Sequence, residues 1–188
     1  MKAYLENRIR NLRNAFPDEK QMESLFGAIQ LLREAIKRGG KLLACGNGGS
    51  AADAQHIVAE FVVKYKNNRR PYPAIALSVD TSVLTACAND FGFEHVFERQ
   101  VKALGKENDV LLAISTSGRS KNVNLAVKAA KEIGLKVIYM TGSKKPEVSD
   151  LCDIILTVNS SETPIIQEIH RVYGHLLVEL FEYMEEYL

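Results

Sequence analysis

Short apolar runs alternate with longer amphipathic segments along most of the chain. Five runs are almost continuously apolar, which is typical of strands that are covered on both faces of a parallel sheet. The predicted strands are residues 41–45, 74–78, 109–115, 136–142 and 153–158. Because helical segments separate them, the pattern predicts βα units and an α/β fold with a five-stranded parallel sheet flanked by helices.

Two long helical segments are predicted before the first strand, within residues 1–40. The second segment begins at Asp18, where Gln21 completes a capping box, and it ends at Gly39-Gly40. We expect such long helices at the chain ends to lie outside the sheet and to pack at subunit interfaces.

The remaining helices follow from the same periodicity. Two short helices are predicted within residues 81–104, one from about residue 121 to 133, and a long one from about residue 164 to 188. We expect one domain over residues 1–188, in which a helical segment (1–40) precedes the α/β core and C-terminal helix (41–188).

Composition and charge narrow the classes of function. The 188 residues are 46% apolar and 25% charged, and the formal net charge of +1 creates no global field that would select nucleic acid or a membrane. No apolar stretch approaches the roughly 18–20 residues that cross a bilayer, and the N-terminal residues lack the apolar core of a signal peptide. We therefore expect a cytoplasmic protein, with Cys45, Cys87 and Cys152 as buried, reduced thiols.

Two loops share one design, in which an apolar strand is followed by glycine and hydroxyl residues and then by a helix. They are residues 42–51 and 111–120, and in an open parallel sheet both are expected at the carboxyl ends of the strands, where ligands bind. The hydroxyls of the second loop, beside the free N–H groups of a helix start, suit a phosphate. These hydroxyls belong to Ser115, Thr116, Ser117 and Ser120. A helix N-cap cluster without a ligand explains the pattern equally well.

The first loop reads Gly46-Asn47-Gly48-Gly49-Ser50. Its glycines allow a ligand to approach the backbone closely, and the amide of Asn47 suits sugar hydroxyls. The loop is neither a GxGxxG motif nor a Walker sequence, which argues against dinucleotide and nucleoside triphosphate binding. A tight structural turn remains the alternative.

The helix after this loop carries two rows of side chains. Ala54, Ile57, Val58, Phe61, Val62 and Tyr65 form a stripe that is expected to face the core. Asp53, His56, Glu60 and Lys64 form a second row. His56 and Glu60 are one turn apart and can therefore meet. The pair could be half of a metal site, an acid–base pair or a surface ion pair, and the pattern alone favours the surface ion pair.

The final helix has the same character. Gln167, Arg171 and His175 follow one flank of its apolar side, whereas His170 borders the apolar stripe and is expected to be packed. His95 has no evident partner in the sequence and is interpreted as structural.

Taken in order, several motifs resemble the phosphoheptose isomerase family of SIS-fold proteins. They are GNGGSAADAQH (46–56), YPAIALS (72–78), NDFGFEHVF (89–97), GKENDVLLAISTSGRSKNV (105–123) and IQEIH…GH (166–175), and together they cover essentially the whole chain. The resemblance implies a SIS fold with a flavodoxin-like sheet. It also implies an aldose–ketose isomerase that converts sedoheptulose 7-phosphate to D-glycero-D-manno-heptose 7-phosphate, the first step towards ADP- or GDP-heptose and lipopolysaccharide.

The resemblance further implies a homotetramer with active sites between subunits and one Zn²⁺ per subunit. Zinc is associated with residues that match His56, Glu60, Gln167 and His175, of which Glu60 and His175 also match the catalytic base and acid. The residues that match the substrate site are Asn47, Gly48, Gly49, Ser50, Glu60, Asn89, Asp90, Ser115, Thr116, Ser117, Ser120 and Gln167.

Two positions depart from the family pattern. Lys64 and Ile165 stand where many members have arginine, and lysine keeps the charge without the bidentate geometry. Two alternatives remain: a non-catalytic SIS regulator that binds the DNA replication initiator, and another SIS phosphosugar isomerase. The presence of all four matched metal residues favours the enzyme.

One expectation comes from helix geometry alone. Gln167 and His175 are eight residues apart, which is about 12 Å along a straight helix. If both bind one metal, they need a long reach, a bent helix or ligands from a neighbouring chain. This spacing predicts a site at a subunit boundary.

Overall fold

The computed structural model describes residues 1–187, with side chains described up to Glu185. Leu188, the predicted end of the last helix, lies outside the described residues. The helices are α1 (Lys2–Ala15), α2 (Glu19–Lys37), α3 (Gly49–Val62), α4 (Thr81–Phe91), α5 (Glu98–Leu104), α6 (Lys121–Ile133) and α7 (Thr163–Tyr187), with short 3-10 turns at Phe93–His95 and Ser149–Leu151. The strands are β1 (Leu42–Gly46), β2 (Ala74–Ala76), β3 (Val110–Ile114), β4 (Lys136–Thr141) and β5 (Ile154–Thr157).

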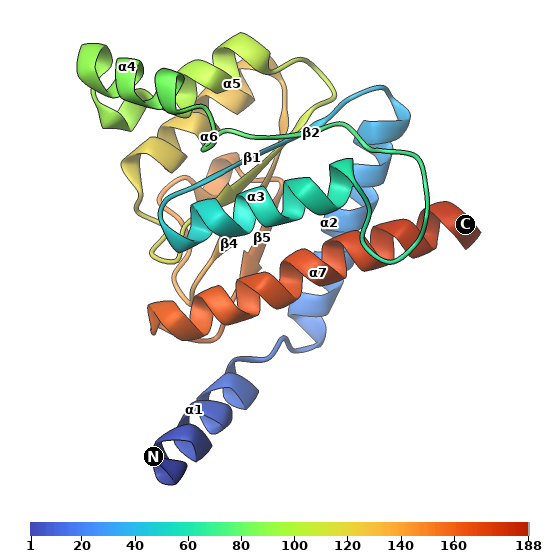
Figure 1. The fold of residues 1–188 in the computed structure, drawn as a ribbon, viewed down its shortest axis with the longest axis vertical. Helices are drawn as coiled ribbons and strands as arrows, with labels where there is room; N and C mark the ends of the chain where they lie inside the picture. The colour runs from blue at the N-terminus through green and yellow to red at the C-terminus, as the bar shows by residue number, and fades with distance from the viewer. Residues whose placement is uncertain (188) are drawn as a thin grey trace.

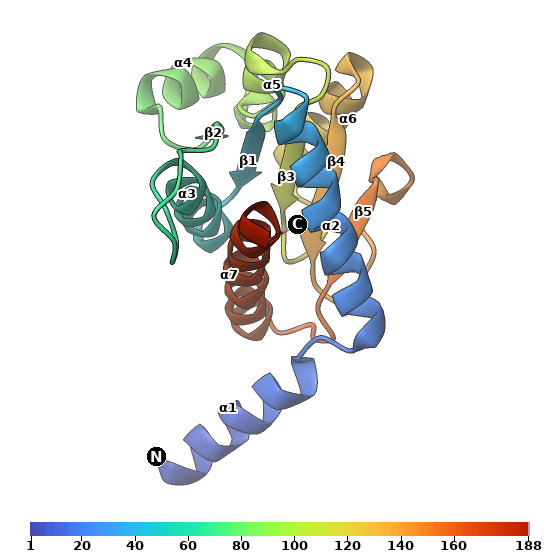
Figure 2. The same cartoon turned by 90° about the vertical axis from the view of Figure 1, so that its right-hand side faces the viewer.

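The five strands form one parallel sheet in the order β2-β1-β3-β4-β5. Figure 1 shows the sheet, and Figure 2 labels all five strands. This is the flavodoxin-like order, in which the direction of strand addition across the sheet reverses between β1 and β3. The predicted α/β fold with a five-stranded parallel sheet is therefore confirmed. The two glycine and hydroxyl loops follow β1 and β3, so they lie next to each other at the switch point.

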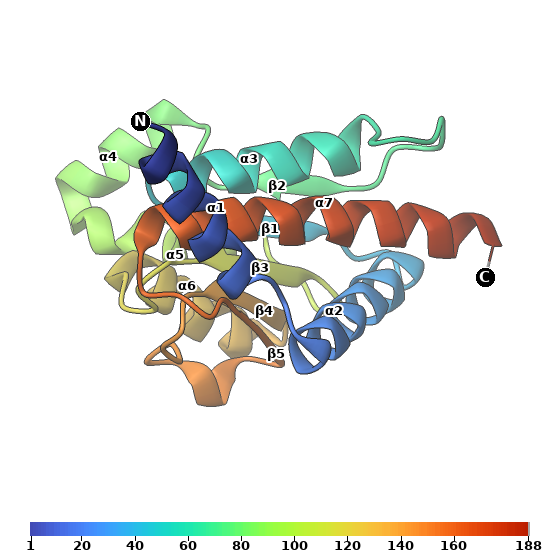
Figure 3. The same ribbon diagram turned by 90° about the horizontal axis from the view of Figure 1, so that it is seen from below.

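Alternate residues of the strands face two apolar layers, which explains why the strand sequences are continuously apolar. Leu42 and Ala44 of β1 pack with α2, α3 and α7, whereas Leu43 and Cys45 pack with α4, α5 and α6. Figure 1 shows α3 and α7 side by side across one face of the sheet, and Figure 3 shows the same pair from below.

Local signals in the sequence act as expected. Asp18 and Gln21 form the capping box of α2, with Gln21 N donating to Asp18 Oδ1 at 2.9 Å and Asp18 N donating to Gln21 Oε1 at 2.8 Å. Gln21 also donates to the carbonyl of Thr157, which joins the start of α2 to β5. Gly134 ends α6 with φ +90°, a conformation that glycine adopts without steric cost.

The structure corrects several details of the sequence analysis. Helix α3 ends at Val62, so Lys64 and Tyr65 lie beyond it, and Val62 is 42% exposed rather than buried. At this end of the helix, the guanidinium of Arg69 donates to the carbonyls of Glu60 and Phe61, which a further helical turn would otherwise bind. His95, expected to have no partner, lies 2.6 Å from Glu98.

The burial of several other side chains can also be compared with expectation. Cys152 is only partly buried, whereas Cys45 and Cys87 are buried as predicted. Ile165, one of the two departures from the family pattern, is fully buried in the core. His170 is fully buried as predicted and lies 3.2 Å from the carbonyl of Thr141.

Helix α1 projects away from the rest of the chain (Figure 2) and contacts α7. It carries exposed apolar side chains at Leu5 and Ile9, followed by Phe16 in the connection to α2. Over the described residues, no helix combines the length and apolar character needed to span a membrane.

Candidate functional site

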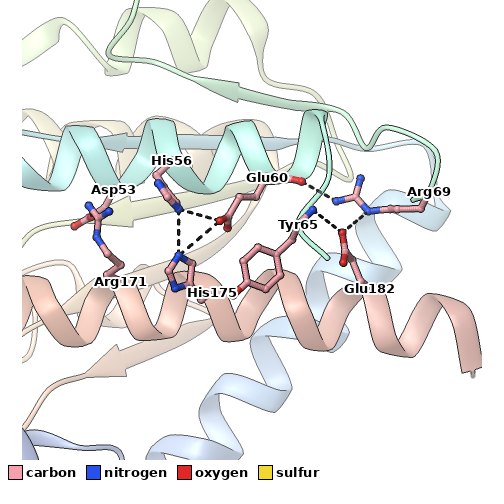
Figure 4. Close-up of polar contacts among 8 residues, drawn as sticks. All are labelled: Asp53, His56, Glu60, Tyr65, Arg69, Arg171, His175 and Glu182. Carbon is pink, nitrogen blue, oxygen red and sulfur yellow. Dashed lines mark hydrogen bonds and ion pairs between the residues drawn. The ribbon is translucent and has the colours of Figure 1, made fainter. Parts of the chain in front are cut away.

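Three side chains from two helices converge between α3 and α7 (Figure 4). His56 Nε2 lies 2.9 Å from Glu60 Oε1 and 3.1 Å from His175 Nε2, and His175 Nε2 lies 3.6 Å from Glu60 Oε1. The two histidines are 119 residues apart in the chain. The one-turn pair on α3 is therefore completed by a third side chain from α7, and we call these residues the triad.

The donor atoms of the triad fit a metal ion. Four ligands that hold zinc at about 2.0–2.1 Å place neighbouring donors roughly 3.3 Å apart, and the three observed separations are 2.9, 3.1 and 3.6 Å. Two imidazoles and a carboxylate are also a ligand set that zinc accepts. Glu60 Oε2 is buried without a hydrogen-bond partner among the described residues, which is costly unless a ligand or ion uses this carboxylate.

The triad depends on a close approach of the two helices. A Cβ at Gly174 would lie 2.8 Å from Cγ1 and 2.9 Å from Cδ1 of Ile57. Gly174 precedes His175 and Ile57 follows His56, so the missing side chain at position 174 allows the two imidazoles to meet.

A groove of about 530 Å³ extends from the triad along α3 and α7. Its lining includes His175 at one end and Gly49 with Gln167 at the other, where the Gln167 amide lies against Gly49. Between the ends, Arg171 Nη2 donates to Asp53 Oδ1 at 2.7 Å. Burial raises the pKa of Asp53, and the charge and hydrogen bond of Arg171 oppose that rise. The structure thus brings His56, Glu60 and His175 together and leaves Gln167 about two helical turns away.

The serine loop after β3 forms a compact hydroxyl cluster. Ser115 Oγ lies 2.9 Å from Ser120 Oγ and 3.4 Å from Ser117 Oγ. Ser120 is the N-cap of α6, yet its side chain makes no capping hydrogen bond. The hydroxyls are therefore directed to one another at the positive end of the helix, an arrangement that suits an anion.

The two loops are fastened together by a reciprocal pair of amides. Asn47 donates to Asn122 and Asn122 donates to Asn47, both at 2.8 Å, and Asn122 Oδ1 also accepts from Val123 N. Gly48 has φ +53°, and Ser50 is buried in the first turn of α3. The loop after β1 therefore runs between the serine loop and the groove.

Several predicted substrate residues lie outside the groove, among them Thr116, Ser117, Asn89 and Asp90. Thr116 and Ser117 line a separate pocket of about 190 Å³ with Arg119 and Lys144. Asp90 on α4 lines a mostly apolar pocket of about 630 Å³ between β2, α4 and α5. Its neighbour Asn89 donates to Asp90 at 2.8 Å.

Three residues near the triad carry roles that sequence reasoning missed. Tyr65, assigned to the core stripe, stacks on His175 with ring centroids 5.5 Å apart. Arg69 and Glu182 join the end of α3 to α7. The stacking of Tyr65 and the pairing of Arg69 with Glu182, 113 residues apart, are contacts between distant segments that the sequence pattern does not indicate.

A sequence profile described as the SIS domain matches residues 3–142. The chain belongs to the SIS domain family. A phosphoheptose isomerase of Clostridium acetobutylicum is 46% identical to it over 186 residues, which is 97% of this chain and 95% of that protein. A phosphoheptose isomerase of Nitratidesulfovibrio vulgaris is 53% identical over 148 residues, covering 79% of this chain and 71% of that protein.

The three-dimensional structure of this chain is also similar to solved structures of phosphoheptose isomerases. The phosphoheptose isomerase from Neisseria gonorrhoeae matches with a TM-score of 0.88 and 42% identity, over 97% of this chain and 96% of that chain. At this identity and coverage, the fold and the family are shared over nearly the full length.

Proposed function

We propose that this SIS domain protein is a phosphoheptose isomerase that converts sedoheptulose 7-phosphate to D-glycero-D-manno-heptose 7-phosphate in the cytoplasm, as the first step towards a nucleotide-activated heptose. The observation that carries the proposal is the convergence of His56, Glu60 and His175 on one point between α3 and α7. Relatives that cover almost the whole chain are named for this activity.

The reaction moves a hydrogen between two adjacent carbons through an enediol. Glu60 removes the proton from C1 of the ketose and returns it to C2, while His175 transfers a proton between the two oxygens. Their facing atoms, Glu60 Oε1 and His175 Nε2, are 3.6 Å apart, which lets them act on neighbouring atoms of one substrate when they are not coordinating a metal ion. Glu60 Oε2, free of hydrogen bonds within the described chain, supports the role of base.

The triad would hold one Zn²⁺. Because Gln167 lies about two helical turns from His175 in its own chain, a neighbouring subunit would supply its Gln167 as a further ligand, while Gln167 of the same chain would contact the substrate. A bound zinc ion would polarise the carbonyl and stabilise negative charge on the oxygens. His56 lies 2.9 Å from Glu60 and would orient that carboxylate in either case.

The length of the substrate supports a heptose phosphate. We propose that Ser115, Thr116, Ser117 and Ser120 bind the phosphate, with Asn47, Gly48, Gly49 and Ser50 beside them. From Gly49 to His56, α3 advances seven residues, or about 10 Å. An extended chain of eight bonds, from C1 of a heptulose to its phosphorus, also spans about 10 Å at the advance per bond of an extended backbone. A phosphate held beside Gly49 would therefore leave C1 within reach of the triad.

We also propose a homotetramer whose active sites are completed by neighbouring subunits. Asn89 and Asp90 lie away from the groove of their own chain, and Gln167 lies apart from the triad. Exposed apolar side chains on α1 and α2 offer surfaces for such contacts. They include Leu5, Ile9, Met22 and Phe26.

The test is direct. Purified protein is incubated with sedoheptulose 7-phosphate, and aldoheptose formation is followed before and after chelation and zinc re-addition. Glu60→Gln and His175→Asn should each abolish turnover while circular dichroism stays unchanged, and His95→Asn, at a surface pair, serves as the matched control. Near-normal turnover by either site variant would refute the assigned roles, and a wild type without turnover would refute the function.

A further inference from the structure

The loop between α3 and β2, residues 63–73, is held against α7 by one buried carboxylate. Glu182 is 3% exposed and accepts three consecutive backbone N–H groups, from Tyr65 at 2.9 Å, Lys66 at 3.0 Å and Asn67 at 3.1 Å. Figure 4 shows the contact with Tyr65. Successive N–H groups that point at one anion form a binding concavity. One side chain of α7 therefore determines the path of this loop as it leaves α3.

Arg69 completes the arrangement from the loop side. Its Nε donates to Glu182 Oε1 at 2.9 Å, its Nη1 to the carbonyl of Phe61 at 2.9 Å and its Nη2 to the carbonyl of Glu60 at 2.7 Å. These carbonyls belong to the negative end of α3, where a cation is favourable. We call Arg69 and Glu182 the clasp, because together they fasten the turn that carries Glu60 to α7.

The clasp is charged at neutral pH. Burial by itself raises the pKa of Glu182, but the N–H groups of the loop and Arg69 outweigh it, so the pKa lies below its ordinary value. Buried charges that are paired and fully hydrogen-bonded specify one geometry, and removal of either partner leaves an uncompensated charge.

The clasp also places the ring of Tyr65. The backbone N–H of Tyr65 is bound to Glu182, and its ring stacks on His175 with an interplanar angle of 22°. On its own loop, Lys66 Nζ lies 5.6 Å from the centre of the Tyr65 ring and 2.6 Å from Glu179. His175 is thus bordered by Tyr65 and by His56, whose ring centre is 5.2 Å away. These two rings contact the imidazole of His175 from different sides.

We infer that Arg69, Glu182 and Tyr65 are positioning residues of the triad: the clasp fixes the turn that carries Glu60, and through Tyr65 it fixes the ring of His175. The inference rests on the proposed function for its kinetic consequence. None of the three touches the serine loop, so their loss should lower kcat and leave KM nearly unchanged. Misplacement of a catalytic group by about 1 Å can cost up to roughly 100-fold in rate.

The kinetic test uses matched pairs of variants. Tyr65→Leu removes the aromatic face and should lower kcat about tenfold or more with KM within about threefold, whereas Tyr65→Phe keeps the face and should retain activity. Glu182→Gln should lower kcat in the same way. Glu179→Gln removes a carboxylate that, among the described residues, holds only the Lys66 side chain in the same loop, and it should leave kcat unchanged.

A second readout does not depend on turnover. The ring of Tyr65 should shift the NMR signal of the His175 Cε1 proton upfield. This shift should disappear in Tyr65→Leu, persist in Tyr65→Phe and Glu179→Gln, and change in Glu182→Gln. A wild type that lacks isomerase activity would refute the proposed function, and the NMR comparison would still decide the positioning. Full kcat and an unchanged His175 signal in Tyr65→Leu, or equal losses in Glu179→Gln and Glu182→Gln, would overturn the inference.

Discussion

A single methyl group at position 174 should separate the two helices that form the triad. The added Cβ of Gly174→Ala would lie 2.8 Å from Ile57 Cγ1, and ordinary contact begins at 3.4 Å, so the groups must move apart by about 0.6 Å. Ile57 is 2% exposed and packed in the core, which leaves its side chain little room to yield.

Two opposing terms set the change in the free energy of unfolding. Overpacking of a well-packed core costs about 1–3 kcal/mol, and alanine gains about 1 kcal/mol over glycine within a helix. We therefore expect Gly174→Ala to be destabilised by about 1 kcal/mol. Because a displacement of about 1 Å can cost up to roughly 100-fold, the expected loss in kcat is about tenfold.

A double-mutant cycle with Ile57→Ala measures this contact. Ile57→Ala removes both atoms that the new methyl would meet, so the double variant should suffer less than the sum of the single changes, with a coupling of about 1 kcal/mol or more. Urea denaturation gives the stabilities, and isomerase assays give kcat. If Gly174→Ala is more stable than the wild type by the full helix propensity and turns over normally, the close approach of α3 and α7 does not control the triad.

Three further changes test the fold and the serine loop. Burial lowers the pKa of His170 to about 4, whereas its pKa in the unfolded chain is near 6.5. Between these two values only the unfolded state binds the proton, so the free energy of unfolding should fall by about 2 kcal/mol from pH 7 to pH 5. Urea titrations of His170→Gln should lack this pH-dependent component. Asp109, which is 2% exposed, accepts from the backbone of Lys41 and Lys106 and from the Lys41 ammonium; Asp109→Ala should lose about 3–5 kcal/mol in urea denaturation, and a similar result for the exposed Asp150→Ala would contradict this reasoning. Ser120→Ala should lower stability by no more than about 1 kcal/mol, since this hydroxyl does not cap α6 and makes one hydrogen bond, to Ser115. It should weaken inhibition by inorganic phosphate about tenfold or more, and unaltered inhibition would remove Ser120 from the phosphate site.

The sequence by itself determined the elements and the places where chemistry could occur. Continuously apolar runs predict strands buried on both faces, and the capping box at Asp18 and the glycine at 134 mark helix ends through contacts within a few residues. The one-turn spacing of His56 and Glu60 likewise guarantees that they can meet. These signals are reliable because backbone geometry and near neighbours alone produce them.

Only the tertiary structure decided which distant residues complete the site. His175 joins His56 because Gly174 allows α7 to approach Ile57, and no periodicity in either helix encodes that contact. In the sequence, Glu182 is indistinguishable from the other acidic residues of its helix. Glu182 becomes part of the clasp only because the loop after α3 directs backbone N–H groups and the side chain of Arg69 at its carboxylate. Contacts between elements depend on how whole faces pack, which the linear pattern does not contain.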